Sequence, residues 1–116
     1  MKYDVYFHND FDGRAAAAVM RVFLEERGDS VARYVPVNFD LKEKWHAFKF
    51  PRPAVLLDFI YHPKVTWWFD HHLTTFIKPV WKKNFQPTQY HHWDPNAPSC
   101  CGQVVKALST RYGFKP

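Results

Sequence analysis

The sequence predicts an α/β fold with three αβα layers around a mainly parallel sheet of about five strands. Two observations favour this class. Segments with strand-like composition alternate loosely with helix-like segments along the 116 residues, which is the order that a parallel sheet requires. The segment AVLLDF at 54–59 is also continuously apolar around its aspartate, as strands buried on both faces are. We therefore expect helices on both faces of the sheet.

The first half of the chain begins with a strand. KYDVYF at 2–7 is rich in aromatic and β-branched residues, and so is SVARYVPV at 30–37. Between these two strands, residues 13–27 have a helical pattern, which Gly28 would end. The aromatic and basic stretch that follows the second strand predicts only a short helix near 41–48. The apolar stripe of the long helix consists of Ala15, Ala18, Val19, Val22 and Phe23.

The second half continues the alternation after the apolar strand. KVTWWF at 64–69 predicts a fourth strand, and QPTQYHHW at 86–93 predicts a fifth. A last helix is expected over 100–112, because Ser99 is a good N-cap and Gly113 is a natural stop. The apolar residues of this helix at helical spacing are Val104, Val105, Leu108 and Tyr112.

Composition narrows the class of protein. A chain of 116 residues that is 47% hydrophobic is long and apolar enough for one domain with a real core, and we treat 1–116 as that domain. No apolar run approaches the roughly 20 residues that span a bilayer. The start, MKYDVYFHND, lacks a signal-peptide core, and the two cysteines are adjacent, so reduced thiols in the cytoplasm are expected. The net charge of +5 favours anionic partners such as phosphates or nucleic acid.

Acids and histidines follow three of the predicted strands at the point where each ends. His8, Asp10 and Asp12 come after the first strand, Asp58 lies at the end of the third, and DHH at 70–72 follows the fourth. Ligands of parallel sheets bind beyond the carboxyl ends of the strands. We therefore expect these side chains to meet at one edge of the sheet.

This combination of ligands points to divalent cations. Imidazole and carboxylate groups suit Mn²⁺, Fe²⁺, Zn²⁺ or Mg²⁺. The candidate set has more members than one tetrahedral ion needs, and it fits a two-metal site in which a carboxylate bridges the ions. The candidate metal ligands are His8, Asp10, Asp12, Asp58 and His71.

Each candidate also has a purely structural interpretation. Asp12 has the chemistry of a helix cap, Asp58 that of a solvated strand end, and a lone pair of histidines is usually on the surface. His91 and His92 are interpreted as amphipathic cover rather than as ligands. The coincidence of three polar groups at three strand ends favours a metal site over these separate explanations.

Two aromatic segments have the same ambiguity. Trp67 and Trp68 are expected in the core and on the sheet face rather than as a platform for stacking bases. WKKNF at 81–85 mixes basic with aromatic residues, as nucleic-acid surfaces do, but is interpreted as a solvated loop.

The ordered set of these motifs resembles the DHH phosphoesterase superfamily. HNDFDG at 8–13, LLDF at 56–59 and FDHH at 69–72 are similar to its first three motifs, and APSCCGQVVKAL at 97–108 is similar to the start of the helix after DHH. The resemblance runs from residue 3 to about residue 110. The superfamily includes single-strand exonucleases, nanoRNases, cyclic-dinucleotide phosphodiesterases and family II inorganic pyrophosphatases.

The resemblance implies a role for each residue of the set. It implies that His8, Asp10, Asp12 and His71 bind metal, and that Asp58 bridges two Mn²⁺ ions, for which Mg²⁺ or Co²⁺ could substitute. His72 would act in catalysis and face the substrate phosphate. Asp70 would orient a histidine, and Arg14 is assigned to substrate binding with His72. The reaction would be attack of a metal-bound hydroxide on phosphorus.

Two departures from the family pattern bear on activity. The family has a fourth motif with a further aspartate after this helix, and Asp94 precedes the helix, so it does not align. A C-terminal substrate domain with a glycine-rich motif is also expected from the family and not found before Pro116. A homodimer partner, a second domain or a partner chain would then complete the substrate site.

These features leave two functions open. The first is a metal-dependent phosphoesterase, of phosphodiesterase or exonuclease type, which cleaves phosphodiester bonds in nucleotides or short oligonucleotides. The second is a non-catalytic DHH domain that binds metal or nucleotide and regulates or scaffolds a partner. A phosphoacceptor signalling domain also clusters acids around a strand-three aspartate, but DHH has no place in such a domain.

Overall fold

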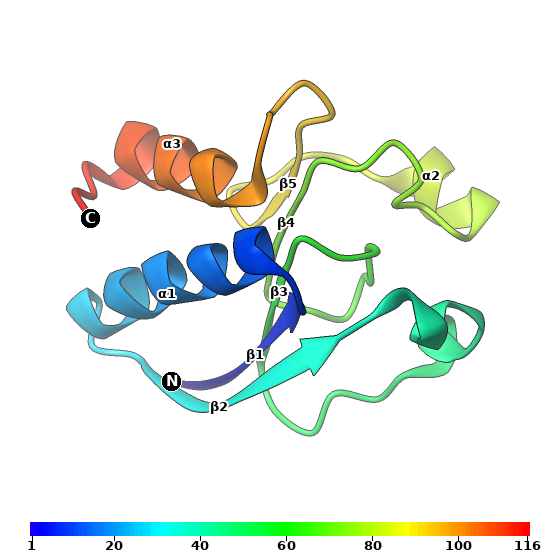
Figure 1. Cartoon of the computed structure of the whole chain (residues 1–116), viewed down its shortest axis with the longest axis horizontal. Helices are drawn as coiled ribbons and strands as arrows, with labels where there is room; N and C mark the ends of the chain where they lie inside the picture. The colour runs from blue at the N-terminus through cyan, green and yellow to red at the C-terminus, as the bar shows by residue number, and fades with distance from the viewer.

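The computed structural model describes residues 1–116 and has one five-stranded sheet, in which all strands are parallel (Figure 1). The strand order is β2-β1-β3-β4-β5, so β1 and β3 lie next to each other in the interior of the sheet. The predicted α/β class with five parallel strands is confirmed. The strands are β1 (Lys2–His8), β2 (Ser30–Val37), β3 (Ala54–Leu57), β4 (Trp67–Asp70) and β5 (His91–Trp93).

Helices lie on both faces of this sheet. The long helices α1 (Phe11–Glu26) and α3 (Cys100–Tyr112) run side by side on one face (Figure 1). The 3₁₀ helix η1 (Phe39–Ala47) and the short helix α2 (Pro79–Asn84) belong to the other face. This is a three-layer αβα arrangement. No helix could cross a bilayer, since even α1, with 16 residues, lacks the necessary length and apolar character.

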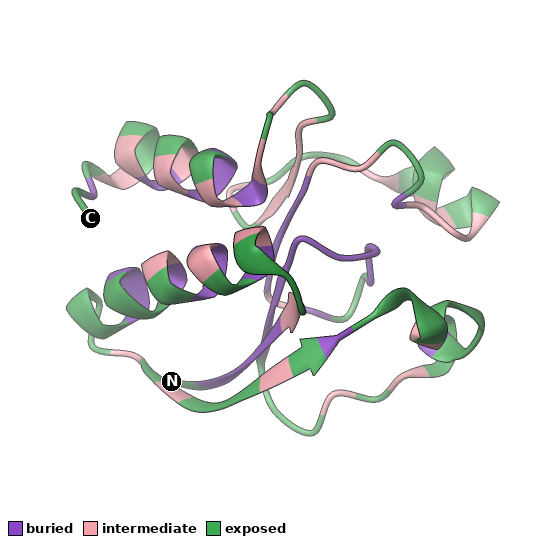
Figure 2. Cartoon of the chain, in the orientation of Figure 1, coloured by how far each residue is buried: buried purple, intermediate pink, exposed green.

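Alternate residues of each strand enter two separate cores. Val5, Val55 and Phe69 pack against α1 and α3. Their neighbours Tyr6 and Leu56 face the opposite side, into an aromatic layer that also contains Trp45 of η1 and Trp68 of β4. This period of two is what a sheet buried on both faces imposes. It also places Trp67 in the first core and Trp68 in the second, as predicted. The inner strands β3 and β4 are buried along their length (purple in Figure 2).

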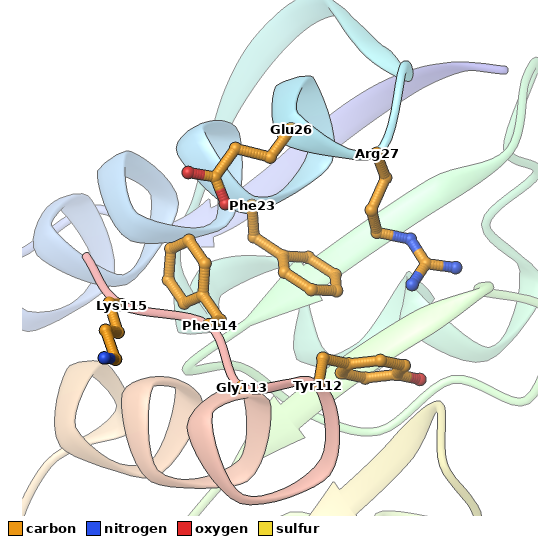
Figure 3. A pocket seen from close by; sticks show the side chains of 7 residues that line it. All are labelled: Phe23, Glu26, Arg27, Tyr112, Gly113, Phe114 and Lys115. Atoms are coloured by element: carbon orange, nitrogen blue, oxygen red, sulfur yellow. The ribbon is translucent and has the colours of Figure 1, made fainter.

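Aromatic side chains pack between the C-terminal ends of α1 and α3. Phe23 of α1 makes edge contacts with Phe114, and the guanidinium of Arg27 lies over the rings of Phe23 and Tyr112, 5.2 and 5.0 Å from their centroids (Figure 3). An open cavity of about 460 Å³ remains between these residues. The contacts tie the last turn of α3 to the last turn of α1.

Several element boundaries differ from the prediction. The first helix begins at Phe11 rather than at residue 13, because Asp10 caps it by accepting from the amide of Gly13. Asp12 is therefore not the cap of this helix. The fourth and fifth strands are shorter than predicted. β5 pairs with β4 only along Trp68–Asp70, so it has only three residues.

The segment WKKNF is not a loop, so that prediction is wrong. Pro79 starts the short helix α2, in which Lys82 and Lys83 are exposed. Trp81 and Phe85 instead pack on Tyr61 of the aromatic layer. The apolar contacts of Trp81 and Phe85 hold the segment against the aromatic layer.

Gly13 allows α1 to start directly above the end of β1. A Cβ atom at this position would lie 2.0 Å from the carbonyl oxygen of His8. No side chain fits such a gap, so only glycine permits the tight strand-to-helix connection. The connection is what carries Asp10 and Asp12 back over the edge of the sheet.

Candidate metal centre

Seven acids and histidines from four segments gather at the carboxyl edge of the sheet. β1 ends at His8, α1 starts beyond Asp10, β3 ends just before Asp58, and β4 leads into DHH. We call this set the carboxyl-edge cluster. Its members are His8, Asp10, Asp12, Asp58, Asp70, His71 and His72.

Asp58 lies at the centre of the cluster. Its carboxylate is 3.1 Å from Nε2 of His71, 3.7 Å from Nδ1 of His8 and 3.9 Å from Nδ1 of His72. The residue is 1% exposed and has a φ of 59°, the one positive φ among the non-glycine residues. Aspartate tolerates this left-handed conformation better than most residues, and such conformations concentrate at functional sites.

His71 presents a nitrogen lone pair to carboxylates. Its Nδ1 lies 3.0 Å from the carbonyl oxygen of Ala97, and because a carbonyl only accepts, Nδ1 carries the hydrogen. In the neutral ring Nε2 is then unprotonated, yet it faces oxygens of Asp58 at 3.1 Å and Asp12 at 3.5 Å. Something positive must lie between these groups, either a proton or a metal ion.

His72 has a different environment. Its Nδ1 donates to the buried carboxylate of Asp70 at 2.6 Å, which leaves Nε2 free. This hydrogen bond raises the pKa of His72 above its usual value, although burial acts in the opposite direction. The other oxygen of Asp70 is buried without a partner. Asp70 therefore orients His72 and favours its protonated form.

His8 and Asp10 form the opposite side of the cluster. Nδ1 of His8 is 2.9 Å from a carboxylate oxygen of Asp10, yet the atom is buried without a hydrogen bond. Burial would raise the pKa of Asp10, but the amide of Gly13 and the nearby His8 together lower it. Asp10 is thus both the cap of α1 and an anion beside an unsatisfied imidazole.

Asp12 joins the cluster to α3. Its two oxygens accept from the backbone amides of Cys100 and Cys101 at 2.8 and 2.9 Å. These amides are at the N-terminus of α3, where a carboxylate is favoured. Asp12 therefore caps α3, which starts 88 residues later in the sequence, rather than the helix to which it belongs.

The crowding of carboxylates has an electrostatic consequence. Burial, together with the charges of Asp12 and Asp10, raises the pKa of Asp58 from 3.8 to about 8. In the absence of a cation, Asp58 is therefore mostly protonated at neutral pH and donates to an acceptor such as Nε2 of His71. A divalent cation would replace this proton, since metal ligands bind in the deprotonated form.

The donor set fits divalent cations. Asp58, Asp70, His71 and His72 offer ligand atoms within 4.8 Å of one another, and His8, Asp10 and Asp58 form a second such group. Asp58 belongs to both groups, which is the arrangement that a carboxylate bridging two ions requires. The unpartnered atoms, Nδ1 of His8 and one oxygen of Asp70, lie one in each group. Asp12 is outside both groups, although it faces His71.

The side chains of Arg14, which was predicted to bind substrate, and of His91 and His92, which were not expected at the site, form no hydrogen bond or ion pair with the cluster. Arg14 is exposed on α1, where its guanidinium donates to Asn9 at 2.9 Å. Nε2 of His91 donates to the carbonyl oxygen of Val65 and Nε2 of His92 to that of Gln89, and the ring of His92 stacks on Phe69. This agrees with their interpretation as cover.

Two further residues that hold the DHH segment were not identified from sequence. The indole of Trp93 donates to the carbonyl of His72 at 2.8 Å, and the amide of Gln103 donates to the carbonyl of Asp70 at 3.0 Å. Gln103 is buried beside Val104 on the apolar face of α3. A polar residue within this apolar stripe is the sequence feature that could have identified it.

An exposed aromatic ring lies against the cluster. Phe39, at the start of η1, is 44% exposed, and its ring centroid is 4.8 Å from that of His8 and 6.1 Å from that of His72. It stacks on Phe59 behind it. Phe39 thus forms an apolar wall beside the candidate metal ligands.

Comparison with known proteins gives no assignment: no family model, no curated protein and no solved structure matches this chain.

Proposed function

We propose that the chain is a divalent-metal-dependent phosphoesterase of the DHH type that hydrolyses phosphodiester bonds in nucleotides or short oligonucleotides. The observation that carries the proposal is the position of Asp58, a buried carboxylate shared by two groups of metal-ligating atoms. Mn²⁺ is the preferred ion, with Mg²⁺ or Co²⁺ as substitutes, because the donor set mixes carboxylate and imidazole groups and the resemblance to the DHH superfamily implies Mn²⁺.

Each residue has a part in this proposal. When bound, a divalent cation supplies Lewis acidity, which activates water near neutral pH and offsets charge on the phosphoryl group. Asp58, Asp10, His8 and His71 would hold it. Ala97 fixes the ring of His71 through Nδ1, so that Nε2 stays directed at the ligand carboxylates.

His72 acts on the substrate. Asp70 holds its Nδ1, so Nε2 is the atom available for a phosphate oxygen. The raised pKa of His72 increases the protonated fraction near neutral pH, and a protonated ring donates a charge-assisted hydrogen bond to an anion. In the transition state this donor would stabilise the charge that develops on the phosphoryl oxygens. Asp70 is a positioning residue in this account.

A non-catalytic function remains the second candidate because of Asp12. Both of its oxygens accept amides of α3, so this carboxylate has less freedom to bind an ion than its position in the motif suggests. One ion held by the remaining ligands would give a domain that binds metal or nucleotide without turnover and regulates or scaffolds a partner. The two candidates share the metal centre and differ in hydrolysis.

Hydrolysis of a dinucleotide is the test. The purified chain is incubated with the dinucleotide and Mn²⁺, and release of mononucleotide is followed by chromatography, with a chelator as the blank. We expect Mn²⁺-dependent release that Asp58→Asn abolishes and Asp40→Asn preserves, since Asp40 is an exposed aspartate of η1 without an ion pair. Metal binding without release would favour the non-catalytic candidate, and release unaffected by Asp58→Asn would overturn the proposed site.

A further inference from the structure

A second hollow lies away from the carboxyl edge. It has a volume of about 800 Å³ and lies between the connection from η1 to β3, the loop from β3 to β4, and α2. Pro53 directly precedes β3, and Lys64 lies three residues before β4, so these two lining residues are near the amino ends of their strands. We call it the basic–aromatic groove. The residues that the argument uses are His46, Lys49, Phe50, Arg52, His62, Lys64 and Trp81.

The charges of the groove are all of one sign. No carboxylate lines it, whereas Lys49, Arg52 and Lys64 do, with His46 beside them. Lys49 and Lys64 are exposed and form no ion pair. Arg52 is held by the buried Asp4 at 3.0 Å, so its position is fixed. The excess positive charge is complementary to an anion.

The walls of the groove are aromatic. The ring of His62 packs on Phe50 at 4.9 Å and on Trp81 at 5.5 Å between centroids. His62 is 3% exposed, its Nε2 has no hydrogen-bond partner, and burial lowers its pKa, so the ring is neutral near pH 7. Trp81 is only half-buried. Aromatic faces beside unpaired lysines are the combination that binds unpaired bases and their phosphates.

We propose that the basic–aromatic groove binds one nucleotide unit of a single-stranded nucleic acid, with its base on Trp81 and its phosphate between Lys49 and Lys64. The segment WKKNF, which mixes basic and aromatic residues, supplies one wall of the groove through Trp81. Binding of this kind tolerates any base, because every base has a flat face. The attraction of the lysines for phosphate makes it salt-dependent.

This site is distinct from the carboxyl-edge cluster. The rings of Phe39, Phe59 and Trp45 contact one another in succession and separate His72 from His62. No member of the cluster lines the groove. The inference goes beyond the proposed function and needs no metal, so the two can fail separately.

Oligonucleotide binding in the presence of a chelator tests the proposal. The probe is a fluorescein-labelled eight-nucleotide single-stranded oligothymidine, followed by anisotropy at several salt concentrations. The charge reversals Lys49→Glu and Lys64→Glu are compared with Lys106→Glu, because Lys106 is also exposed and unpaired but lies on α3. Trp81→Leu keeps an apolar side chain against His62 but removes the stacking surface.

We expect each groove lysine reversal to weaken binding several-fold and to lower the slope of log affinity against log salt by about one. Trp81→Leu should weaken it about tenfold, and Lys106→Glu should change it less than twofold. Thermal melts of each variant show whether the fold is retained. Equal losses in all three lysine variants, or no binding by wild type, would overturn the proposal. Displacement by polyglutamate as readily as by unlabelled oligothymidine would instead assign the groove to acidic proteins.

Discussion

Asp58 combines three properties at the scale of a single residue. It is buried, it has a left-handed backbone conformation, and its pKa is raised to about 8 by burial and by the charges of Asp12 and Asp10. A carboxyl group whose pKa is higher in the folded chain than in the unfolded chain binds its proton more tightly when folded. Stability is then lost as the pH rises from the unfolded value towards the folded one.

The sign of this effect gives a pH prediction. Between about pH 4 and pH 8, Asp58 should make the metal-free protein progressively less stable as the pH rises. Asp58→Asn keeps a residue that tolerates the backbone conformation but removes the titration. Urea unfolding at pH 5 and pH 8, with a chelator, should show that the free energy of unfolding of Asp58→Asn increases relative to that of wild type as the pH rises. Asp40→Asn should show no such gain. A constant difference between Asp58→Asn and wild type would mean that the pKa of Asp58 is not raised.

The two histidines of DHH should differ in their effects on metal binding and on turnover. His71→Ala removes Nε2 from between Asp58 and Asp12, so we expect weaker Mn²⁺ binding and loss of turnover. His72→Ala removes a group that acts in the transition state, so it should lower the rate with a nearly intact Mn²⁺ affinity. Calorimetry and dinucleotide hydrolysis measure the two effects. The reverse pattern would exchange the two roles.

At the scale of elements, both long helices have their N-terminus at the carboxyl edge, where an aspartate accepts backbone amides of the first turn. Asp10 caps α1 from within its own turn, and Asp12 accepts the first amides of α3. The two helix N-termini thus direct positive potential towards a cluster of carboxylates. Gly13 makes this geometry accessible, because any Cβ there would meet the carbonyl of His8.

Replacement of Gly13 tests this connection. Gly13→Ala should destabilise the protein by about 2–3 kcal/mol, because the clash is with backbone and cannot be relieved by a rotamer. It should also weaken Mn²⁺ binding, since His8 and Asp10 must move. Gly102→Ala is the matched control: its Cβ would meet only the side-chain oxygen of Ser99 at 3.0 Å, and alanine favours the helix. Equal stabilities of the two variants in urea would contradict the account of Gly13.

The sequence predicted the order and type of most elements but not their ends. Strand-like composition, apolar runs and helical spacing are local, so the strands around 2–7 and 54–59 and the helix at 100–112 were identifiable. Strand ends depend on pairing partners, which is why 86–90 was wrongly assigned to a strand. The helix at 79–84 was missed, because its stability comes from the contact of Trp81 and Phe85 with Tyr61.

The candidate site was also predictable from local sequence only in part. The convergence of His8, Asp58 and DHH follows from parallel strands whose carboxyl ends meet at one edge. The bonds from Cys100 and Cys101 to Asp12 span 88 and 89 residues, and no local pattern encodes them. The resemblance to the DHH superfamily supplied roles for the residues, and these roles stay predictions.

At the scale of the whole molecule, unpaired acids and unpaired bases lie in different places. The chain carries a net charge of +5, yet two of its three buried carboxylates, Asp58 and Asp70, lie at the carboxyl edge without Lys or Arg, whereas the third, Asp4, is paired with arginines. No carboxylate lines the basic–aromatic groove. Like charges gathered at one place destabilise the fold unless something of opposite charge binds there. The molecule is therefore expected to gain stability from divalent cations, and above the dissociation constant the gain should rise with the logarithm of their concentration.

Isothermal titration with Mn²⁺ at pH 7.5 tests the central claim, that Asp58 unites one metal centre. Wild type should bind one to two ions at micromolar concentrations, Asp58→Asn should lose most of this binding, and Asp40→Asn should bind as wild type does. Equal binding by Asp58→Asn and wild type, or no micromolar binding by wild type, would contradict the claim.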